Sequence, residues 1–409
     1  MADTEEHLAE LGQLTDTAGA QVVGTLQQRL DAPHPKYYIG EGKVSELREL
    51  VAERRASLVI FDEELSPAQG KNLEDALKTR VMDRAELILD IFATRARTAE
   101  AQMQVELAQL EYMLPRLKRM WTHLSRIRGG IGFRGPGETQ LETDRRLITR
   151  RIGDLREKLE VVARRRATQR KARAEEFTAA LVGYTNAGKS SILQSLSGAD
   201  LVIEDRLFAT LDPATRIVEL EPGIKALVTD TVGFIRKLPH NLVASFSATL
   251  EEAMTADVLL HAIDASHPGW EEQKEVVEQV LEQLGLKARP TLLVFNKVDR
   301  LTHGEEKAFR ARATALFERA VFTSAVEADG LAELKQVLLD EVRKQRPEVR
   351  LEIPYADGEA LATVYREGEV LRREEDGGSI GIVARLPQAT LGRLRNRSGI
   401  IVTGHDGGS

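Results

Sequence analysis

Near-continuous apolar runs, separated by amphipathic stretches, alternate along the second half of the chain. Strands that are buried on both faces of a parallel sheet read in this way, whereas half-exposed strands alternate apolar and polar positions. The runs are Ala179–Val182, Ala226–Val228, Val258–Ile263, Thr291–Phe295 and Val321–Thr323. With helical segments between them, they predict a doubly wound parallel α/β sheet over residues 177–346.

The first 95 residues show a shorter version of the same alternation. The apolar run Tyr37–Ile39 leads into a helical Lys43–Arg54, and Leu58–Phe61 is followed by the Ser66-Pro67 pair, typical of an N-cap and first helical residue. The short run Val81–Met82 precedes another helix. We predict a small βαβ-type α/β domain with a parallel sheet.

The middle segment, residues 96–176, reads as helix on both sides of a glycine-rich stretch. Thr94–Arg126 and Leu141–Glu176 are long, charged and almost free of helix breakers, whereas RIRGGIGFRGPGETQ lies between them. A stretch so dense in glycine cannot continue a helix. We therefore predict two helices joined by a basic loop, an arrangement compatible with an antiparallel coiled-coil hairpin.

The last sixty residues alternate the strand-like segments LEIPY and IGIVARL with a helical Gly358–Arg373. This pattern predicts a small terminal α+β domain, whose role no motif indicates. The expected domain boundaries are 1–95 for the N-terminal α/β domain, 96–176 for the basic helical linker, 177–346 for the nucleotide-binding domain and 347–409 for the C-terminal domain.

The linker differs from the rest of the chain in its net charge. The formal net charge is −7, yet residues 115–176 hold 18 Lys plus Arg against 8 Asp plus Glu, a local net of +10 that leaves −17 for the remainder. One basic segment thus lies in an otherwise acidic chain, and it is the place where a polyanion would bind.

Composition narrows the cellular context. The chain has no cysteine, so a disulfide framework and a thiolate metal site are both excluded. The acidic start MADTEEHLAE lacks the pattern of a signal peptide, and no later stretch approaches the roughly 18 apolar residues of a membrane span. We expect a cytoplasmic protein without a membrane span.

A phosphate-binding loop is the first motif that carries chemistry. The segment Gly183–Ser190, GYTNAGKS, matches G-x-x-x-x-G-K-S/T between a predicted strand and a predicted helix. Its glycines let backbone N–H groups turn toward a β-phosphate, Lys189 can reach the β and γ oxygens, and the Ser190 hydroxyl can bind Mg²⁺. Taken alone, the pattern also fits an ordinary strand–turn–helix junction.

Three further motifs follow in order, each at the end of a predicted strand. In the first, DTVG, Asp230 would hold a Mg²⁺-bound water and Gly233 would place its N–H near the γ-phosphate. In the second, NKVD, Asp299 can accept the ring N1–H and the exocyclic amine of guanine, a donor pair that adenine lacks. The third, Thr323–Ala325, would offer a backbone N–H to guanine O6.

Each of these motifs could be an ordinary surface loop. Their occurrence in this order, at the carboxyl ends of strands where an open α/β sheet binds its ligand, favours a site for GTP.

The threonine of the first switch is harder to place. We choose Thr210 in LFATLDP as the residue that closes over Mg²⁺ and the γ-phosphate, with Thr215 as the alternative. The segment 203–215 is expected to be mobile without the γ-phosphate.

The predicted catalytic residues are Lys189, Thr210, Gly233 and Phe234. The predicted metal ligands are Ser190, Thr210 and, through water, Asp230. The predicted nucleotide-contacting residues are Gly183, Tyr184, Thr185, Asn186, Ala187, Gly188, Lys189, Ser190, Ser191, Phe208, Ala209, Thr210, Asp230, Thr231, Val232, Gly233, Asn296, Lys297, Asp299, Ser324 and Ala325.

Two positions bear on the rate of hydrolysis. Phe234 stands where many GTPases keep a glutamine that orients the attacking water, so we predict slow intrinsic turnover. Asn186 resembles the asparagine with which some GTPases hold K⁺ between the phosphates. The alternative reading of Asn186 is a turn residue.

Two further sequence signals are weaker. Gly130–Gly135 satisfies G-x-G-x-x-G as text, but an arginine-rich helical stretch precedes it where a dinucleotide site needs a strand. The run Arg164–Arg166 could be a solvated helix face. Because the basic excess extends over some sixty residues, a surface that binds RNA phosphates is at least as good an interpretation as a solvated helix face.

At this point the sequence resembles the HflX family of translational GTPases. The resemblance is carried by TAGAQVVG, YYIGEGKVSEL, RGGIGFRGPGETQLETDRR, GYTNAGKSS, LFATLDP, DTVGFIRKLPHNLVASFSATLEE and NKVD. It implies an N-terminal family domain, a helical linker and a G domain. It also implies a hydrophobic residue in place of the glutamine, which agrees with Phe234. The residues after Pro347 carry no usable resemblance.

The family resemblance implies association with the large ribosomal subunit and its rRNA, with splitting or recycling of stalled or idle ribosomes. We expect a monomer that binds GTP and GDP with Mg²⁺, with K⁺ near Asn186 as an additional cofactor. The alternative is a GTP-dependent switch for a non-ribosomal partner. No motif supports ATP binding by the N-terminal domain.

Overall fold

A computed structural model of the chain describes residues 2–117, 140–172, 176–198, 207–238, 252–376 and 378–404. The chain divides into two compact units. The first comprises Met1–Arg165, Glu204–Asp212 and Arg236–Ala248, and the second comprises Arg166–Ile203, Pro213–Ile235 and Thr249–Ser409. Each unit is described by itself below.

The first unit begins with a small parallel α/β domain, as predicted. Strand β1 (Leu58–Phe61) pairs in parallel with β2 (Arg80–Asp83), and the helices are α1 (Ala2–Thr17), α2 (Glu41–Arg54), α3 (Pro67–Leu77) and α4 (Arg84–Arg95). The Ser66 side chain accepts from the N–H of Gln69, whose side chain in turn accepts from the Ser66 N–H. This capping box confirms that Ser66 and Pro67 begin a helix.

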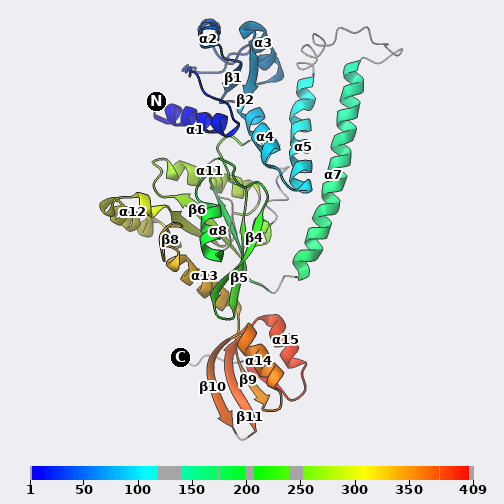
Figure 1. Cartoon of the computed structure of the whole chain (residues 1–409), viewed down its shortest axis with the longest axis vertical. Coiled ribbons are helices and arrows are strands. Elements are labelled where there is room, and N and C mark those ends of the chain that lie inside the picture. Colours follow the sequence, from blue (N-terminus) through cyan, green and yellow to red (C-terminus); the bar gives the residue numbers. More distant parts are fainter. Residues whose placement is uncertain are drawn as a thin grey trace. The chain divides into compact units, whose positions relative to one another are not determined.

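A helical hairpin completes the first unit. Helix α5 (Ala99–Met113) is followed by a short 3₁₀ turn, Leu114–Arg116, and lies beside α7 (Gln140–Ala172) (Figure 1). The expected start at Thr94 is wrong, because α4 continues to Arg95 and α5 begins after Thr98, whose side chain caps it. The glycine-rich loop, with Gly130–Gly135, lies outside the described residues.

Apolar side chains form the seam of the hairpin. Leu155 is fully buried, and the ion pairs Arg151–Glu106 and Arg156–Glu111 flank the apolar contacts at 2.7 Å each. The seam consists of Met103, Leu107, Leu110, Leu114, Ile148, Ile152, Leu155 and Leu159.

The second unit is built on a six-stranded sheet of order β4-β5-β3-β6-β7-β8. Its strands are β3 (Thr178–Gly183), β4 (Ala214–Glu221), β5 (Ile224–Asp230), β6 (Val258–Asp264), β7 (Thr291–Asn296) and β8 (Ala320–Phe322). All neighbours are parallel except the edge pair β4–β5. The expectation of a wholly parallel sheet is therefore wrong at this edge.

Helices cover both faces of this sheet (Figure 1). On one face α8 (Lys189–Ser197) and α13 (Ala332–Gln345) contribute buried residues to a core that includes Leu260 and Val294. On the other face α11 (Trp270–Gln283) and α12 (His303–Leu316) pack against Ile263 and Phe295. Strand β6 is buried along its whole length, which explains why its sequence is apolar apart from His261 and the final Asp264.

The C-terminal part of the second unit is a four-stranded antiparallel sheet of order β10-β11-β9-β12, covered by two helices (Figure 1). Its elements are β9 (Glu348–Pro354), α14 (Gly358–Glu367), β10 (Glu369–Asp376), β11 (Ser379–Arg385), α15 (Gln388–Arg395) and β12 (Ile401–Gly404). The buried positions alternate along β9 and β11, so one face of the sheet packs on the helices.

The expected helix Gly358–Arg373 is wrong in its second half. Helix α14 ends at Glu367, and Gly368 begins the change to strand. A Cβ on Gly368 would lie 2.3 Å from a methyl carbon of Leu386, so only glycine fits there. The charged run after it, which resembles a helix face in sequence, is edge strand β10.

Candidate nucleotide-binding site

The phosphate loop runs from the end of β3 to the start of α8, as its sequence predicts. A Cβ on Gly183 would lie 2.3 Å from the Ala262 carbonyl oxygen, and one on Gly188 would lie 2.3 Å from Asn296 Nδ2. Gly188 also has φ +90°, and Asn186 is left-handed at φ +61°. The loop therefore needs glycine at both positions, because a side chain would displace the neighbouring strands.

Lys189 lies inside this loop. Its Nζ donates to the carbonyl oxygens of Gly183 at 3.1 Å and Tyr184 at 2.9 Å. Burial lowers the pKa of Lys189 to about 8, while the charge of Asp230 opposes the shift. The ammonium group is thus held at the centre of the loop, where it can meet the charge of a polyphosphate.

Ser190 and Asp230 place two oxygen atoms together. The Ser190 hydroxyl donates to Asp230 Oδ2 at 2.6 Å, although the two residues come from α8 and the end of β5. Hydroxyl and carboxylate oxygens are the ligands that Mg²⁺ prefers. Within the described part of the chain, no group of three or more His, Cys, Asp or Glu could hold a metal ion. A metal here would need further ligands from phosphate or water.

The residues after Asp230 are tied to the phosphate loop through their backbone. The N–H of Thr185 donates to the Phe234 carbonyl at 2.7 Å, and the N–H of Phe234 donates to the Gly183 carbonyl at 3.0 Å. A Cβ on Gly233 would lie 2.8 Å from the Thr185 Cα and 3.1 Å from Lys189 Nζ. Gly233 therefore lies against the residue that reaches the phosphates.

The Phe234 side chain is buried, with 1% of its surface exposed. It offers no polar atom to a water molecule, in contrast to a glutamine.

The NKVD segment connects the loop to the base-binding region. Asn296 Nδ2 donates to the Ala187 carbonyl at 3.1 Å, while Asn296 Oδ1 accepts from the Thr323 hydroxyl at 3.2 Å. Lys297 Nζ donates to the Asn186 carbonyl at 2.7 Å and pairs with Asp264 at 2.8 Å. These side chains therefore link four loops at the carboxyl ends of β3, β6, β7 and β8.

Asp264 is a site residue that the sequence motifs did not identify. It ends β6, accepts from the backbone and side chain of Ser266, and pairs with Lys297. Its position at the carboxyl end of an apolar strand is the signal that could have found it.

The predicted base-recognition residues lie in two loops. Asp299 is exposed in a 3₁₀ turn, Val298–Arg300, directly after β7. The Ser324 N–H donates to the Gly330 carbonyl at 3.0 Å. The Ser324 N–H is therefore already engaged, and Ala325 is the residue of this loop whose N–H we expect to donate to guanine O6. This role stays a prediction.

Three predicted residues belong to the first unit. Phe208, at φ +56°, packs edge-on against Phe92 with ring centroids 4.6 Å apart. Asp212 accepts from the N–H groups of Arg97 at 3.2 Å and Thr98 at 3.4 Å. The assignment of Phe208, Ala209 and Thr210 to the first switch stays a prediction.

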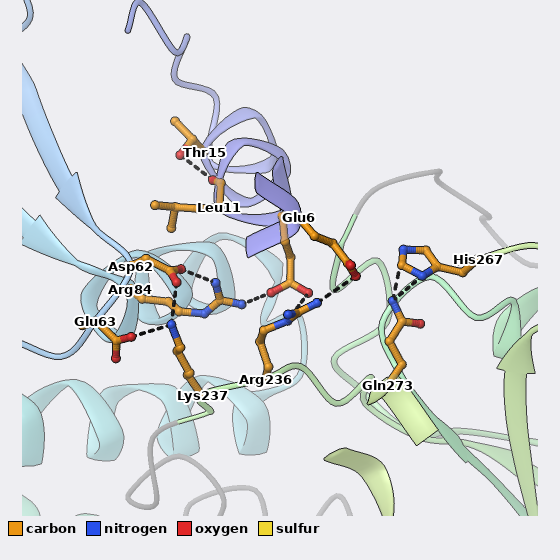
Figure 2. Close-up of polar contacts among 11 residues, drawn as sticks. Glu6, Leu11, Thr15, Asp62, Glu63, Arg84, Arg236, Lys237, His267 and Gln273 are labelled. Carbon is orange, nitrogen blue, oxygen red and sulfur yellow. Dashed lines mark hydrogen bonds and ion pairs between the residues drawn. The ribbon is translucent and has the colours of Figure 1, made fainter. Parts of the chain in front are cut away.

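The residues that follow Phe234 and Ile235 in the chain take part in a partly buried ion network of the first unit (Figure 2). Arg236, 5% exposed, pairs with Glu6 at 3.1 Å and Glu10 at 3.4 Å. Lys237 Nζ lies 2.6 Å from carboxylate oxygens of both Asp62 and Glu63.

Arg84 completes the network, since it pairs with Glu10 and, at 2.7 Å, with Asp62. Sequence motifs identified none of these partners, because they lie more than 170 positions from Arg236 and Lys237.

Comparison with known proteins finds matches along most of the chain. Three family models match: GTP-binding GTPase N-terminal over residues 5–93, GTP-binding GTPase Middle Region over 95–173, and 50S ribosome-binding GTPase over 178–297. A solved structure of a GTP-binding protein from Sulfolobus solfataricus in complex with GDP is 25% identical, with a TM-score of 0.43, over 83% of this chain and 96% of that chain.

Two curated relatives match nearly the whole chain. GTPase HflX of Caldanaerobacter subterraneus is 45% identical over 96% of this chain and 90% of its own length. GTPase HflX of Escherichia coli is 44% identical over 95% of this chain and 92% of its own length. At this identity over nearly the whole of both chains, the chain belongs to the HflX family of GTPases, which bind GTP and hydrolyse it to GDP and phosphate.

Proposed function

We propose that this GTPase associates with the large ribosomal subunit and splits or recycles stalled or idle ribosomes. The observation that carries the proposal is the exposed basic surface of α7, in a chain matched by a 50S ribosome-binding GTPase model. The curated relatives at 44–45% identity are HflX GTPases, and the ribosomal role that the resemblance to this family implies is what the proposal extends to this chain.

Helix α7 carries the positive charge that we expect to contact RNA phosphates. Its sequence holds eleven Lys plus Arg against five Asp plus Glu, a net of +6 over Gln140–Ala172. Arg145, Arg150 and Arg165 are exposed along the helix. Closely spaced exposed arginines favour the phosphate backbone of RNA, and each phosphate contact adds to the salt dependence of binding.

Cosedimentation with purified large subunits tests this surface. We expect the triple variant Arg145→Glu, Arg150→Glu, Arg165→Glu to bind large subunits at least tenfold more weakly than the natural chain, and with a shallower salt dependence. The matched control reverses three exposed arginines of the C-terminal domain, Arg366, Arg372 and Arg393.

Equal binding by the two triple variants would contradict the role of α7. No cosedimentation of the natural chain with large subunits, in either nucleotide state, would favour the alternative of a switch for a non-ribosomal partner.

A bound Mg²⁺ fits the Ser190–Asp230 pair. We propose that Ser190 ligates the ion directly and that Asp230 holds one of its waters, with Thr210 added from the first switch. The ion would neutralise charge on the β- and γ-phosphates. Both protein ligands are hard oxygen donors at the mouth of the phosphate loop, and this supports the proposal.

The buried side chain of Phe234 supports slow intrinsic turnover, because no polar group at that position can orient water. We propose further that K⁺ bound near Asn186 assists hydrolysis. The left-handed backbone of Asn186 and the bond from Lys297 to its carbonyl hold this residue at the loop surface. Equal turnover in K⁺ and Na⁺ buffers would exclude the K⁺ role and leave Asn186 as a turn residue.

A further inference from the structure

The β4–β5 hairpin joins the two segments that sense the nucleotide. Strand β4 begins at Ala214, within the last residues of the predicted first switch (203–215), and β5 ends at Asp230, which accepts from the Ser190 hydroxyl. At this end the two strands are bonded by their side chains as well, with the hydroxyls of Thr215 and Thr229 2.9 Å apart. A γ-phosphate that reorders these segments must therefore act on this end of the hairpin.

The far half of the hairpin leaves the sheet. The ladder between β3 and β5 covers only Leu227–Asp230, and within the described residues β4 pairs with β5 alone. The outer residues Val218, Ile224 and Ala226 are buried in the core that contains Leu338 and Val342 of α13. The far half is thus supported by α13, which leads straight into the C-terminal domain.

The tip of the hairpin rests on the C-terminal domain. Gly223, at φ +81° in a Pro-Gly turn, lies so close to the end of α14 that a Cβ would be 3.4 Å from the carbonyl oxygens of Arg366 and Gly368. The turn needs glycine, because the third position of a type II turn has positive φ. A side chain at the tip would therefore be in ordinary van der Waals contact with the backbone at the end of α14.

Arg343, in the last turn of α13, clamps this contact. Its guanidinium forms two bonds to Glu369, the first residue of β10, at 2.6 and 3.0 Å, and donates to Glu221 at the hairpin tip at 2.9 Å. The Arg343 and Glu369 side chains are 24% and 17% exposed. Paired, partly buried charges of this geometry are stronger than surface ion pairs.

We propose that the β4–β5 hairpin is a lever through which the C-terminal domain sets the nucleotide preference of the G domain. The clamp holds the far half of the hairpin against the C-terminal domain, while the other end of the hairpin carries Asp230 and its bond from Ser190. A partner that displaces the C-terminal domain would release the hairpin and change the ratio of the GTP and GDP affinities. Such coupling is reciprocal, so exchange of GDP for GTP would change the strength of the clamp.

Affinities for GDP and for a slowly hydrolysed GTP analogue test the lever in the full chain. We expect Arg343→Gln and Glu221→Gln each to shift the ratio of the two dissociation constants about fivefold, both in the same direction, at the lower end of typical couplings between sites. The double variant should show the same shift as either single variant, because both remove one clamp.

Lys344→Gln is the matched control. It lies next to Arg343 on α13 and pairs with Glu341, at 3.0 Å, away from the hairpin. Its ratio of dissociation constants should stay within twofold of the natural value. A merely structural clamp would lower the melting temperature of the Arg343 and Glu221 variants and leave their ratio unchanged, which would overturn the proposal. Shifts of the two variants in opposite directions would overturn it as well.

Discussion

At the scale of single residues, the site is shaped by glycine positions where no side chain fits. Gly183, Gly188 and Gly233 each lie so close to a neighbouring loop that a Cβ would make a contact of 2.8 Å or less. The phosphate loop, residues 230–234 and Asn296 are thereby brought within bonding distance. A Gly188→Ala change would place alanine in a backbone conformation with positive φ, and its Cβ would clash with Asn296 Nδ2.

Lys189 gives a prediction about pH. Burial lowers its pKa to about 8 in the nucleotide-free site, and a bound polyphosphate would raise that pKa again. At a pH between these two pKa values, binding of the polyphosphate must be accompanied by uptake of a proton by Lys189. GDP affinity should therefore be nearly constant from pH 7 to 7.5 and weaken as pH rises from 8 to 9, by up to about tenfold per unit.

Calorimetric titration of GDP at pH 8, in two buffers of different ionisation enthalpy, measures this proton directly. We expect an uptake of about half a proton at a pH equal to the pKa of the free site. Binding without proton uptake at pH 8 would mean that Lys189 is already fully charged before the nucleotide arrives.

The motif residues of the site could be predicted from the sequence, because each motif follows an apolar run that reads as a strand. Asp264 and Arg236 could not. Asp264 has its role only because β6 lies beside β7, which brings it to Lys297. Arg236 pairs with residues more than two hundred positions away, so its partners exist only in the folded unit.

At the scale of elements, apolar periodicity predicted the buried strands and failed at the edges. Strand β4 has one buried position among eight, and Ile217 on it is 58% exposed, so no apolar run marks it. Strand β10 is a charged edge that alternates poorly, and its sequence therefore resembles a helix face. The start of α3 at Ser66 and Pro67 was predicted correctly, because a capping box depends only on neighbouring residues in the sequence.

The helical hairpin of α5 and α7 gives a prediction at this scale. Leu155 is fully buried in the seam, so Leu155→Ala should destabilise the hairpin by about 2–5 kcal/mol. Hydrogen exchange in α5 and α7 should rise accordingly. The matched control is Leu147→Ala on the same helix, 58% exposed, which we expect to change stability by less than about 0.5 kcal/mol. Equal exchange in the two variants would mean that the helices do not support one another.

At the scale of the whole molecule, the distribution of charge separates two tasks. The basic excess is concentrated in the linker, while the remaining chain is acidic, and no helix among the described residues is long and apolar enough to cross a membrane. Phosphate chemistry lies in the G domain, and the surface suited to RNA lies on α7. The proposed ribosomal role depends on both.

GTP turnover with and without purified large ribosomal subunits tests this account most directly. We predict slow turnover by the chain alone, in keeping with the buried Phe234, and an increase of at least tenfold with saturating large subunits. Asp299→Asn should turn over xanthosine triphosphate in place of GTP, because an asparagine amide matches the xanthine edge, and large subunits should stimulate that turnover equally. Turnover of GTP that stays unchanged at saturating large subunits would contradict the account.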